Sequence, residues 1–110
     1  MAHELPLFDV ETEAADGVVT LSLTGELDYG TVGTLQGSLA GVVRKHPADR
    51  LRIDLRGLEF IDSAGMSALI AAHADARGRG TTMQIVRGSE RVQRPLEVVG
   101  LDQIVEFVDE

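Results

Sequence analysis

Apolar and polar residues alternate with a period of two at the start of the chain, which is the pattern of strands that bury one face. The alternation runs over residues 7–13 and returns over residues 18–24. The dipeptide Asp16-Gly17 stands between the two runs and favours a tight turn. The pattern predicts an antiparallel hairpin, with residues 7–13 as an edge strand and with the second strand ending at Gly25.

After the hairpin, the apolar residues recur at the spacing of an amphipathic helix. Asp28 or Thr31 is expected to cap this helix, and the pair His46-Pro47 is expected to end it. Three glycines at four-residue spacing within the segment each cost about 1 kcal/mol relative to alanine. We interpret them as a sign of close helix-to-sheet packing or of a shorter helix, in preference to a helix–helix contact face. The apolar positions are Val32, Leu35, Leu39, Val42 and Val43, and the glycines are Gly33, Gly37 and Gly41.

The second half of the chain alternates between strand and helix patterns. A strand over residues 51–55 and a separate apolar patch over residues 58–61 lead into a helix that Gly78 and Gly80 end. Spacings of three and four place the buried face of that helix on Met66, Leu69, Ile70 and His73. The elements expected after it are a strand over residues 81–86, a helix over residues 90–99 and a last short strand over residues 104–108.

This order of elements predicts an α/β fold in a single domain that spans residues 1–110. A hairpin followed by three strand and helix alternations makes a mostly parallel five-stranded sheet with an N-terminal antiparallel hairpin, flanked by helices. A content of 44% apolar residues in a chain of 110 residues suffices for one hydrophobic core.

Composition narrows the classes of function. The chain has no cysteine, so disulfides and thiolate chemistry are excluded, and a reducing compartment, the cytoplasm, is expected. The start does not resemble a signal peptide, and no apolar stretch approaches the length of about 20 residues that spans a bilayer, so no membrane association is expected. A net charge of -8 argues against nucleic acid as a direct partner and leaves solubility alone or a basic protein partner as its explanation.

The segment Phe60–Gly65, of sequence FIDSAG, marks a junction between a strand and a helix. Asp62 or Ser63 is expected at the N-cap of that helix, and a cap of this kind contributes about 1 kcal/mol. Because Ala64 and Gly65 are small, the Ser63 hydroxyl is expected to be accessible to the active site of another protein. The segment is therefore either a simple capping site or a site of modification at Ser63.

A second segment, Leu23–Asp28 of sequence LTGELD, ends a strand with the carboxylates Glu26 and Asp28. The carboxyl ends of parallel strands lie along one edge of an α/β sheet, so Asp28 is expected close to Ser63. Taken alone, Asp28 would be a helix cap. Together the two segments define one surface.

Over nearly its whole length the chain resembles the STAS domain family, in particular the anti-sigma factor antagonists. The resemblance rests on these two segments, on the apolar strand over residues 51–55 and on Val99-Gly100-Leu101 before the last strand. It implies that the unphosphorylated protein binds an anti-sigma factor that is also a serine kinase, and thereby frees a sigma factor.

The same resemblance implies a reversible switch. Phosphorylation of Ser63 breaks the complex, and a metal-dependent serine phosphatase restores binding. Tyr29 and Gly30 stand where the family often has a polar or histidine pair, which leaves the identity of the partner open. The implied partner-binding residues are Glu26, Asp28, Asp62, Ser63, Ala64 and Gly65.

Other functions fit the sequence less well. An enzyme needs a nucleophile with a base, a metal site or a phosphate cradle, but the three histidines show no ligand spacing and Ser67 lacks the glycines of a nucleophile elbow. We therefore expect no catalysis, no metal and no cofactor. A response-regulator phosphoacceptor needs a late lysine, whereas the only lysine is Lys45. Within the family, the alternative is a subunit of a membrane transporter or of a larger stress-signalling complex.

Overall fold

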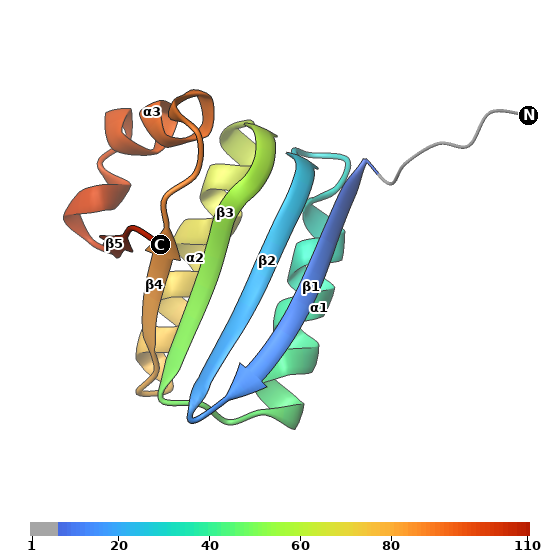
Figure 1. Ribbon diagram of the computed structural model, residues 1–110, viewed down its shortest axis with the longest axis vertical. Coiled ribbons are helices and arrows are strands. Elements are labelled where there is room, and N and C mark those ends of the chain that lie inside the picture. The colour runs from blue at the N-terminus through green and yellow to red at the C-terminus, as the bar shows by residue number, and fades with distance from the viewer. Residues whose placement is uncertain (1–6) are drawn as a thin grey trace, which may run out of the picture.

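The computed structural model describes residues 7–110, which form one sheet and its helices (Figure 1). The strands follow the order β1-β2-β3-β4-β5 across the sheet; β1 pairs antiparallel with β2, and the other pairs are parallel. The predicted five-stranded α/β fold with an N-terminal hairpin is therefore confirmed. The elements are β1 (Phe8–Ala15), β2 (Val18–Leu27), α1 (Val32–Lys45), β3 (Arg50–Ile61), α2 (Ser63–Gly78), β4 (Thr82–Val86), α3 (Glu90–Val98), the 3-10 turn η1 (Leu101–Gln103) and β5 (Glu106–Val108).

Helices α1 and α2 cover one face of the sheet, and the other face is polar. Figure 1 shows both helices behind the strands, with α3 near the carboxyl ends of β3 and β4. Strand β3 explains the arrangement, because buried Leu51, Ile53 and Leu55 alternate with Arg52 and Asp54. Helices on both faces would need near-continuous apolar strands. The core between sheet and helices includes the fully buried Leu21, Leu23, Leu27, Leu35, Ile53, Leu55, Leu69 and Ile85.

Two strand boundaries differ from the prediction, and a glycine explains each. Strand β2 continues past Gly25 to Leu27, because Gly25 takes a φ of 91° and the pairing shifts register there instead of ending. Strand β3 runs unbroken from Arg50 to Ile61, because β3 takes up one extra residue between Asp54 and Gly57 and Gly57 then pairs with Thr24. A glycine next to a register shift looks like a turn residue in the sequence, which is why the pattern predicts shorter strands. The bounds of β4, α3 and β5 lie within two residues of the predicted ones.

The buried face of α2 also differs from the predicted one. Ile70 is 39% exposed, and Met66 and His73 are only half-buried, so of the predicted face only Leu69 is buried. Small residues take the buried positions because they let the helix lie close to the strands. The buried residues of α2 are Gly65, Ala68, Leu69, Ala72 and Ala76.

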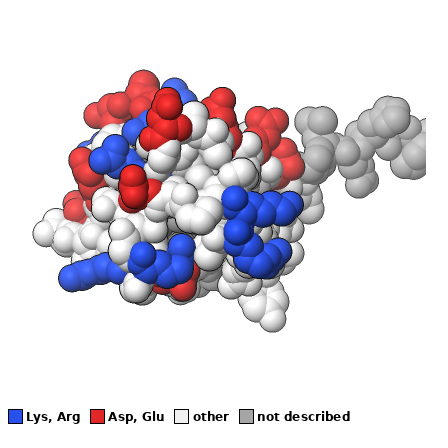
Figure 2. All heavy atoms as spheres, turned by 90° about the horizontal axis from the view of Figure 1, so that it is seen from below, with Lys and Arg blue, Asp and Glu red and all other residues white. Residues whose placement is uncertain are grey.

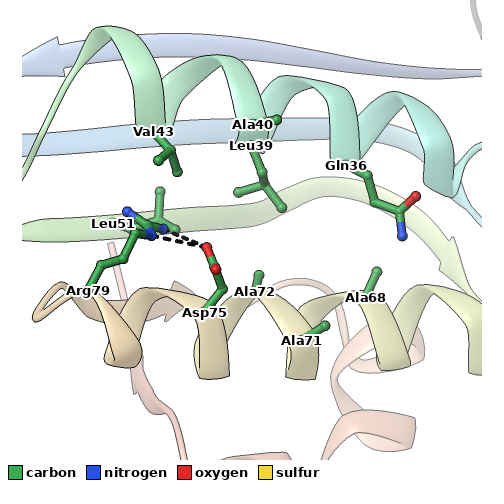
Figure 3. A pocket seen from close by; sticks show the side chains of 10 residues that line it. All are labelled: Gln36, Leu39, Ala40, Val43, Leu51, Ala68, Ala71, Ala72, Asp75 and Arg79. Atoms are coloured by element: carbon green, nitrogen blue, oxygen red, sulfur yellow. Dashed lines mark hydrogen bonds and ion pairs between the residues drawn. The ribbon is translucent and has the colours of Figure 1, made fainter.

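These small residues leave a groove between α1 and α2 (Figure 3). Its volume is about 380 Å³, and Leu39 and Val43 of α1 face the alanines of α2 across it. At one end, Asp75 and Arg79 form an ion pair with an N–O distance of 2.9 Å. The side chains of α1 and α2 therefore leave part of the space between the two helices unfilled.

The three glycines of α1 do not serve close packing. The helix runs to Lys45, and a Cβ added at Gly33, Gly37 or Gly41 would meet no atom within 4 Å. Close helix-to-sheet packing and a shorter helix, the two interpretations preferred from the sequence, are therefore both wrong. The glycines cost helix stability without a packing gain in this chain.

We expect Gly37→Ala to raise the free energy of unfolding by up to about 1 kcal/mol, because alanine restricts the unfolded chain and has a higher helix propensity. Urea denaturation measures the change. Gly25→Ala is the opposite control, since its Cβ would clash with the Leu7 carbonyl and its φ is 91°. A stability loss in Gly37→Ala would contradict the open surroundings of this glycine.

Asp54 is a carboxylate held in the polar face of the sheet, with only 8% of its surface exposed. It accepts hydrogen bonds from the Arg56 guanidinium at 2.8 and 3.1 Å and from the Arg56 backbone N–H at 3.0 Å. The hydrogen bonds from the guanidinium hold the pKa of Asp54 below its ordinary value of 3.8, although burial acts in the opposite direction.

This shift makes a prediction about pH. We expect Asp54→Asn to unfold at lower urea concentration than the natural chain at neutral pH, because the amide loses the charge-assisted hydrogen bonds. A group whose pKa is depressed by folding stabilises above its unfolded pKa and stops doing so as the pH falls through its folded pKa. The two urea midpoints should therefore converge below pH 3.8. A difference between the two urea midpoints that stays constant down to the pH of acid unfolding would argue against a stabilising role of the ionised Asp54 carboxylate.

Basic and acidic side chains lie on different sides of one end of the molecule, the end opposite the carboxyl ends of β2 and β3 (Figure 2). Basic side chains gather there on the helix side, and acidic side chains lie mostly on the sheet side. The last turns of α1 and α2 carry Arg44, Lys45 and Arg77. Cations in the last turn stabilise a helix through its dipole, so these residues have a structural role.

Candidate functional site

The carboxyl ends of β2 and β3 lie side by side. Leu27 and Ile61 are partners in the parallel register, and the Asp62 N–H donates to the Leu27 carbonyl at 3.2 Å. The segments that leave the two strands therefore start from one edge of the sheet. Asp28 follows the first strand and Ser63 the second, as expected from the sequence.

The Asp62 carboxylate joins these two segments. Its Oδ1 accepts a hydrogen bond from the Gly65 N–H at 2.9 Å, which makes Asp62 the N-cap of α2. Its Oδ2 accepts from the Tyr29 N–H at 3.1 Å, across 33 positions of sequence. Asp62 is thus a positioning residue that fixes the start of α2 against the segment after β2.

The Asp28 carboxylate shapes its own segment. Its Oδ1 accepts from the Gly30 N–H at 3.0 Å and from the Thr31 N–H at 3.1 Å. Thr31 holds the N-cap position of α1 without a capping hydrogen bond from its side chain, and its hydroxyl donates to the Glu26 carbonyl at 2.7 Å. Asp28 is half-buried and satisfies backbone groups before α1, so of the two predicted caps Thr31 takes the N-cap position and Asp28 does not.

Ser63 is the first residue of α2, and its side chain is exposed. Within residues 7–110 its hydroxyl makes no hydrogen bond, because Asp62 already provides the cap. The next residue, Ala64, is half-buried and adds little bulk beside the hydroxyl. A free hydroxyl thus stands at a helix N-terminus, where the backbone dipole favours an added anion.

Gly65 lets the first turn of α2 lie against the ends of β2 and β3. It is buried, and a Cβ on it would lie 2.7 Å from the Leu27 carbonyl oxygen and 2.8 Å from Ile61 Cγ1. Only glycine lets α2 begin this close to the end of β2. Gly65 therefore sets the position of Ser63 and offers no exposed side chain of its own.

Two exposed aromatic residues border the site. Tyr29 is 85% exposed and is held near Ser63 through its N–H bond to Asp62. Phe60 is 44% exposed and is the register partner of Glu26, so both lie on the polar face of the sheet at its carboxyl edge. Exposed aromatic rings at a site of this kind are typical anchors of protein interfaces.

Sequence reasoning did not assign these aromatic residues a role. Tyr29 was noticeable only as a departure from the family pattern, and its hydrogen bond to Asp62 is a tertiary contact. Phe60 lies one residue beyond the last register shift of β3, which turns its ring outward. The signal that the sequence offers is an aromatic residue next to the last position of an apolar strand.

Other kinds of site find little support in the part of the chain that the structure describes. No group of three or more His, Asp or Glu side chains in residues 7–110 is arranged to bind a metal ion. Over the same residues, no helix combines the length and the hydropathy that a membrane span requires.

Comparisons with known proteins agree with this fold. The STAS domain family matches residues 9–110. The anti-sigma-F factor antagonist RsfB of Mycobacterium tuberculosis is 33% identical over 88 residues, which cover 80% of this chain and 70% of that protein. The crystal structure of an anti-sigma factor antagonist from Mycobacterium paratuberculosis has a TM-score of 0.84 and 30% identity, over 96% of this chain and 89% of that one.

A more distant structure shares the fold alone. SpoIIAA, an anti-sigma factor antagonist in its unphosphorylated form, has a TM-score of 0.79 at 17% identity, over 93% of this chain and 88% of that one. The matched family region takes in both segments of the candidate site and all of the five strands except Phe8, the first residue of β1. The chain therefore belongs to the STAS domain family, and over most of its length it is similar to anti-sigma factor antagonists.

Proposed function

We propose that this chain is an anti-sigma factor antagonist that binds an anti-sigma factor while Ser63 is unphosphorylated. Binding occupies the anti-sigma factor and so frees the sigma factor that it holds. The observation that carries the proposal is the exposed Ser63 hydroxyl at the start of α2, without a hydrogen bond within residues 7–110. Similarity to proteins named anti-sigma factor antagonists supports this class of partner.

The anti-sigma factor is itself a serine kinase in this proposal. The γ-phosphorus of ATP forms a bond to Ser63 Oγ as its bond to the leaving ADP breaks, and the hydroxyl proton passes to a base in the active site of the kinase. The phosphate adds about -1.5 to -2 charges beside Asp62, whereas the N-terminus of α2 offers only about +0.5. Contacts made around the uncharged hydroxyl are then lost.

The size of the effect suffices for a switch. One misplaced pair of charges 4 Å apart near a protein surface costs up to about 4 kcal/mol. A loss of about 3 kcal/mol already weakens binding by about two orders of magnitude. The modified chain keeps its fold, because a helix N-terminus tolerates an anion. A metal-dependent serine phosphatase removes the phosphate and restores binding.

Phosphoryl transfer tests this proposal directly. The chain is incubated with its cognate anti-sigma factor, ATP and Mg²⁺, and the phosphate is located by mass spectrometry. We expect one phosphate on Ser63 and none on Ser63→Ala. Phosphate on a residue other than Ser63 would overturn the proposal. In a second experiment the chain is used to capture its partners from native cells, and capture of a membrane transporter in place of an anti-sigma factor would also overturn it.

A further inference from the structure

The outer face of α3 forms a groove with Met66 of α2, next to the candidate site. The groove has a volume of about 570 Å³. Met66 lies three residues after Ser63, so the groove begins within one turn of the hydroxyl. Figure 1 shows α3 at the same end of the molecule as the start of α2. The groove and the Ser63 surface are therefore within reach of one partner.

Exposed apolar side chains border this groove. Val98 is 79% exposed and Val99 is 52% exposed, although the opposite side of α3 buries Val92 and Leu96 completely. The inner face of α3 thus packs against the core, and the exposed valines do not take part in that packing. Adjacent exposed valines next to a polar rim are typical of a surface that another protein covers.

The rim of the groove is basic on an acidic chain. Arg91 and Arg94 are exposed and line the groove, and neither forms an ion pair within residues 7–110. The neighbouring Arg87 differs, since it pairs with Glu97 at 3.7 Å and with Asp109 at 3.2 Å. Glu90 is the acidic residue among those that line the groove, which leaves a net positive rim.

We propose that this α3 groove is a second docking surface for the anti-sigma factor, and that it receives an apolar side chain flanked by carboxylates. Charge complementarity argues for this occupant, because Arg91 and Arg94 attract carboxylates while Val98 and Val99 cover an apolar side chain. The identity of the partner rests on the proposed function.

The charges on the groove and on the Ser63 surface also favour one orientation of the bound partner. Glu26, Asp28 and Asp62 lie at the carboxyl ends of β2 and β3, whereas Arg91 and Arg94 lie on α3. Figure 1 shows the end of β2 and α3 on either side of the start of α2. A partner must therefore present a basic region to the first side and an acidic region to the second. Binding in the reverse orientation would bring like charges together, which is a source of specificity.

The test uses the unphosphorylated chain and the purified anti-sigma factor. We expect the double variant Arg91→Glu/Arg94→Glu to bind at least about tenfold more weakly and with a weaker dependence on salt concentration. The matched control for the single variant Arg91→Glu is Arg50→Glu, which makes the same charge change at an exposed position where β3 begins, at the far end of the molecule. Val98→Ser, at an exposed position, is expected to weaken binding several-fold without charge reversal or loss of folding.

The outcomes separate this inference from the proposed function. Weaker binding by the α3 variants supports the docking surface, whatever the affinity of Ser63→Glu. Normal binding by Ser63→Glu would argue against the phosphorylation switch and would leave the docking surface supported. Unchanged affinity in both α3 variants, with Ser63→Glu still defective, overturns the inference and leaves the switch intact. Arginine-dependent binding of a DNA duplex, or self-association lost in the α3 variants with no effect on the anti-sigma factor, also overturns it.

Discussion

Ser63→Glu is expected to weaken binding to the anti-sigma factor by about two orders of magnitude, the consequence of a loss of about 3 kcal/mol. The glutamate places a negative charge at the first position of α2, beside the Asp62 carboxylate that caps the helix. The fold should be unaffected, because an acidic residue in the first turn stabilises a helix by about 0.3–1 kcal/mol. Calorimetric titration of each variant with the anti-sigma factor measures the change.

Ala74→Glu provides the matched control for charge. Ala74 is exposed on the same helix and eleven residues further along, which is about 16 Å at the rise of an α-helix. The net charge of the chain changes equally in the two variants. Equal affinities for Ser63→Glu and Ala74→Glu would mean that position 63 has no special role in the interface.

Gly65→Ala is expected to lower the free energy of unfolding by about 1–3 kcal/mol, the usual cost of overpacking a close contact. The added Cβ would lie 2.7 Å from the Leu27 carbonyl oxygen and 2.9 Å from Leu27 Cγ. To relieve this, α2 must move away from the end of β2, which stretches the hydrogen bond from Tyr29 to Asp62. We therefore expect weaker binding of the anti-sigma factor as well as lower stability.

The same substitution at the other end of the helix should act in the opposite direction. A Cβ on Gly78 would meet nothing within 4 Å, so Gly78→Ala should leave stability unchanged or raise it by up to about 1 kcal/mol. Urea denaturation of both variants gives the comparison. A neutral Gly65→Ala would disprove the close approach of α2 to β2.

Alternating residues predict most of the fold because each strand of this sheet buries one face only. The hairpin, the parallel strands and the helices between them follow from that period and from the turn residues. The period misleads where a bulge inserts a residue, as between Asp54 and Gly57, because the face of every later side chain then changes. It also misleads in α2, where alanines and a glycine, which carry almost no hydrophobic signal, make the contact with the sheet.

The candidate site was predictable in part. The position of Ser63 at a helix start follows from the strand before it and the small residues after it. The double role of Asp62 does not, because its bond to Tyr29 joins residues 33 positions apart. The α3 groove is also invisible in the sequence, since the exposure of Val98 depends on which face of α3 meets β3.

The affinity of the chain phosphorylated on Ser63 tests the central claim most directly. The protein is phosphorylated to completion, the site is verified by mass spectrometry, and its binding to the anti-sigma factor is compared with that of the unmodified protein. We predict binding at least about 100-fold weaker, restored by phosphatase, with amide NMR shifts confined to the start of α2 and its neighbours. Equal affinity of the two forms, or shifts spread over the whole sheet, would contradict a local switch at Ser63.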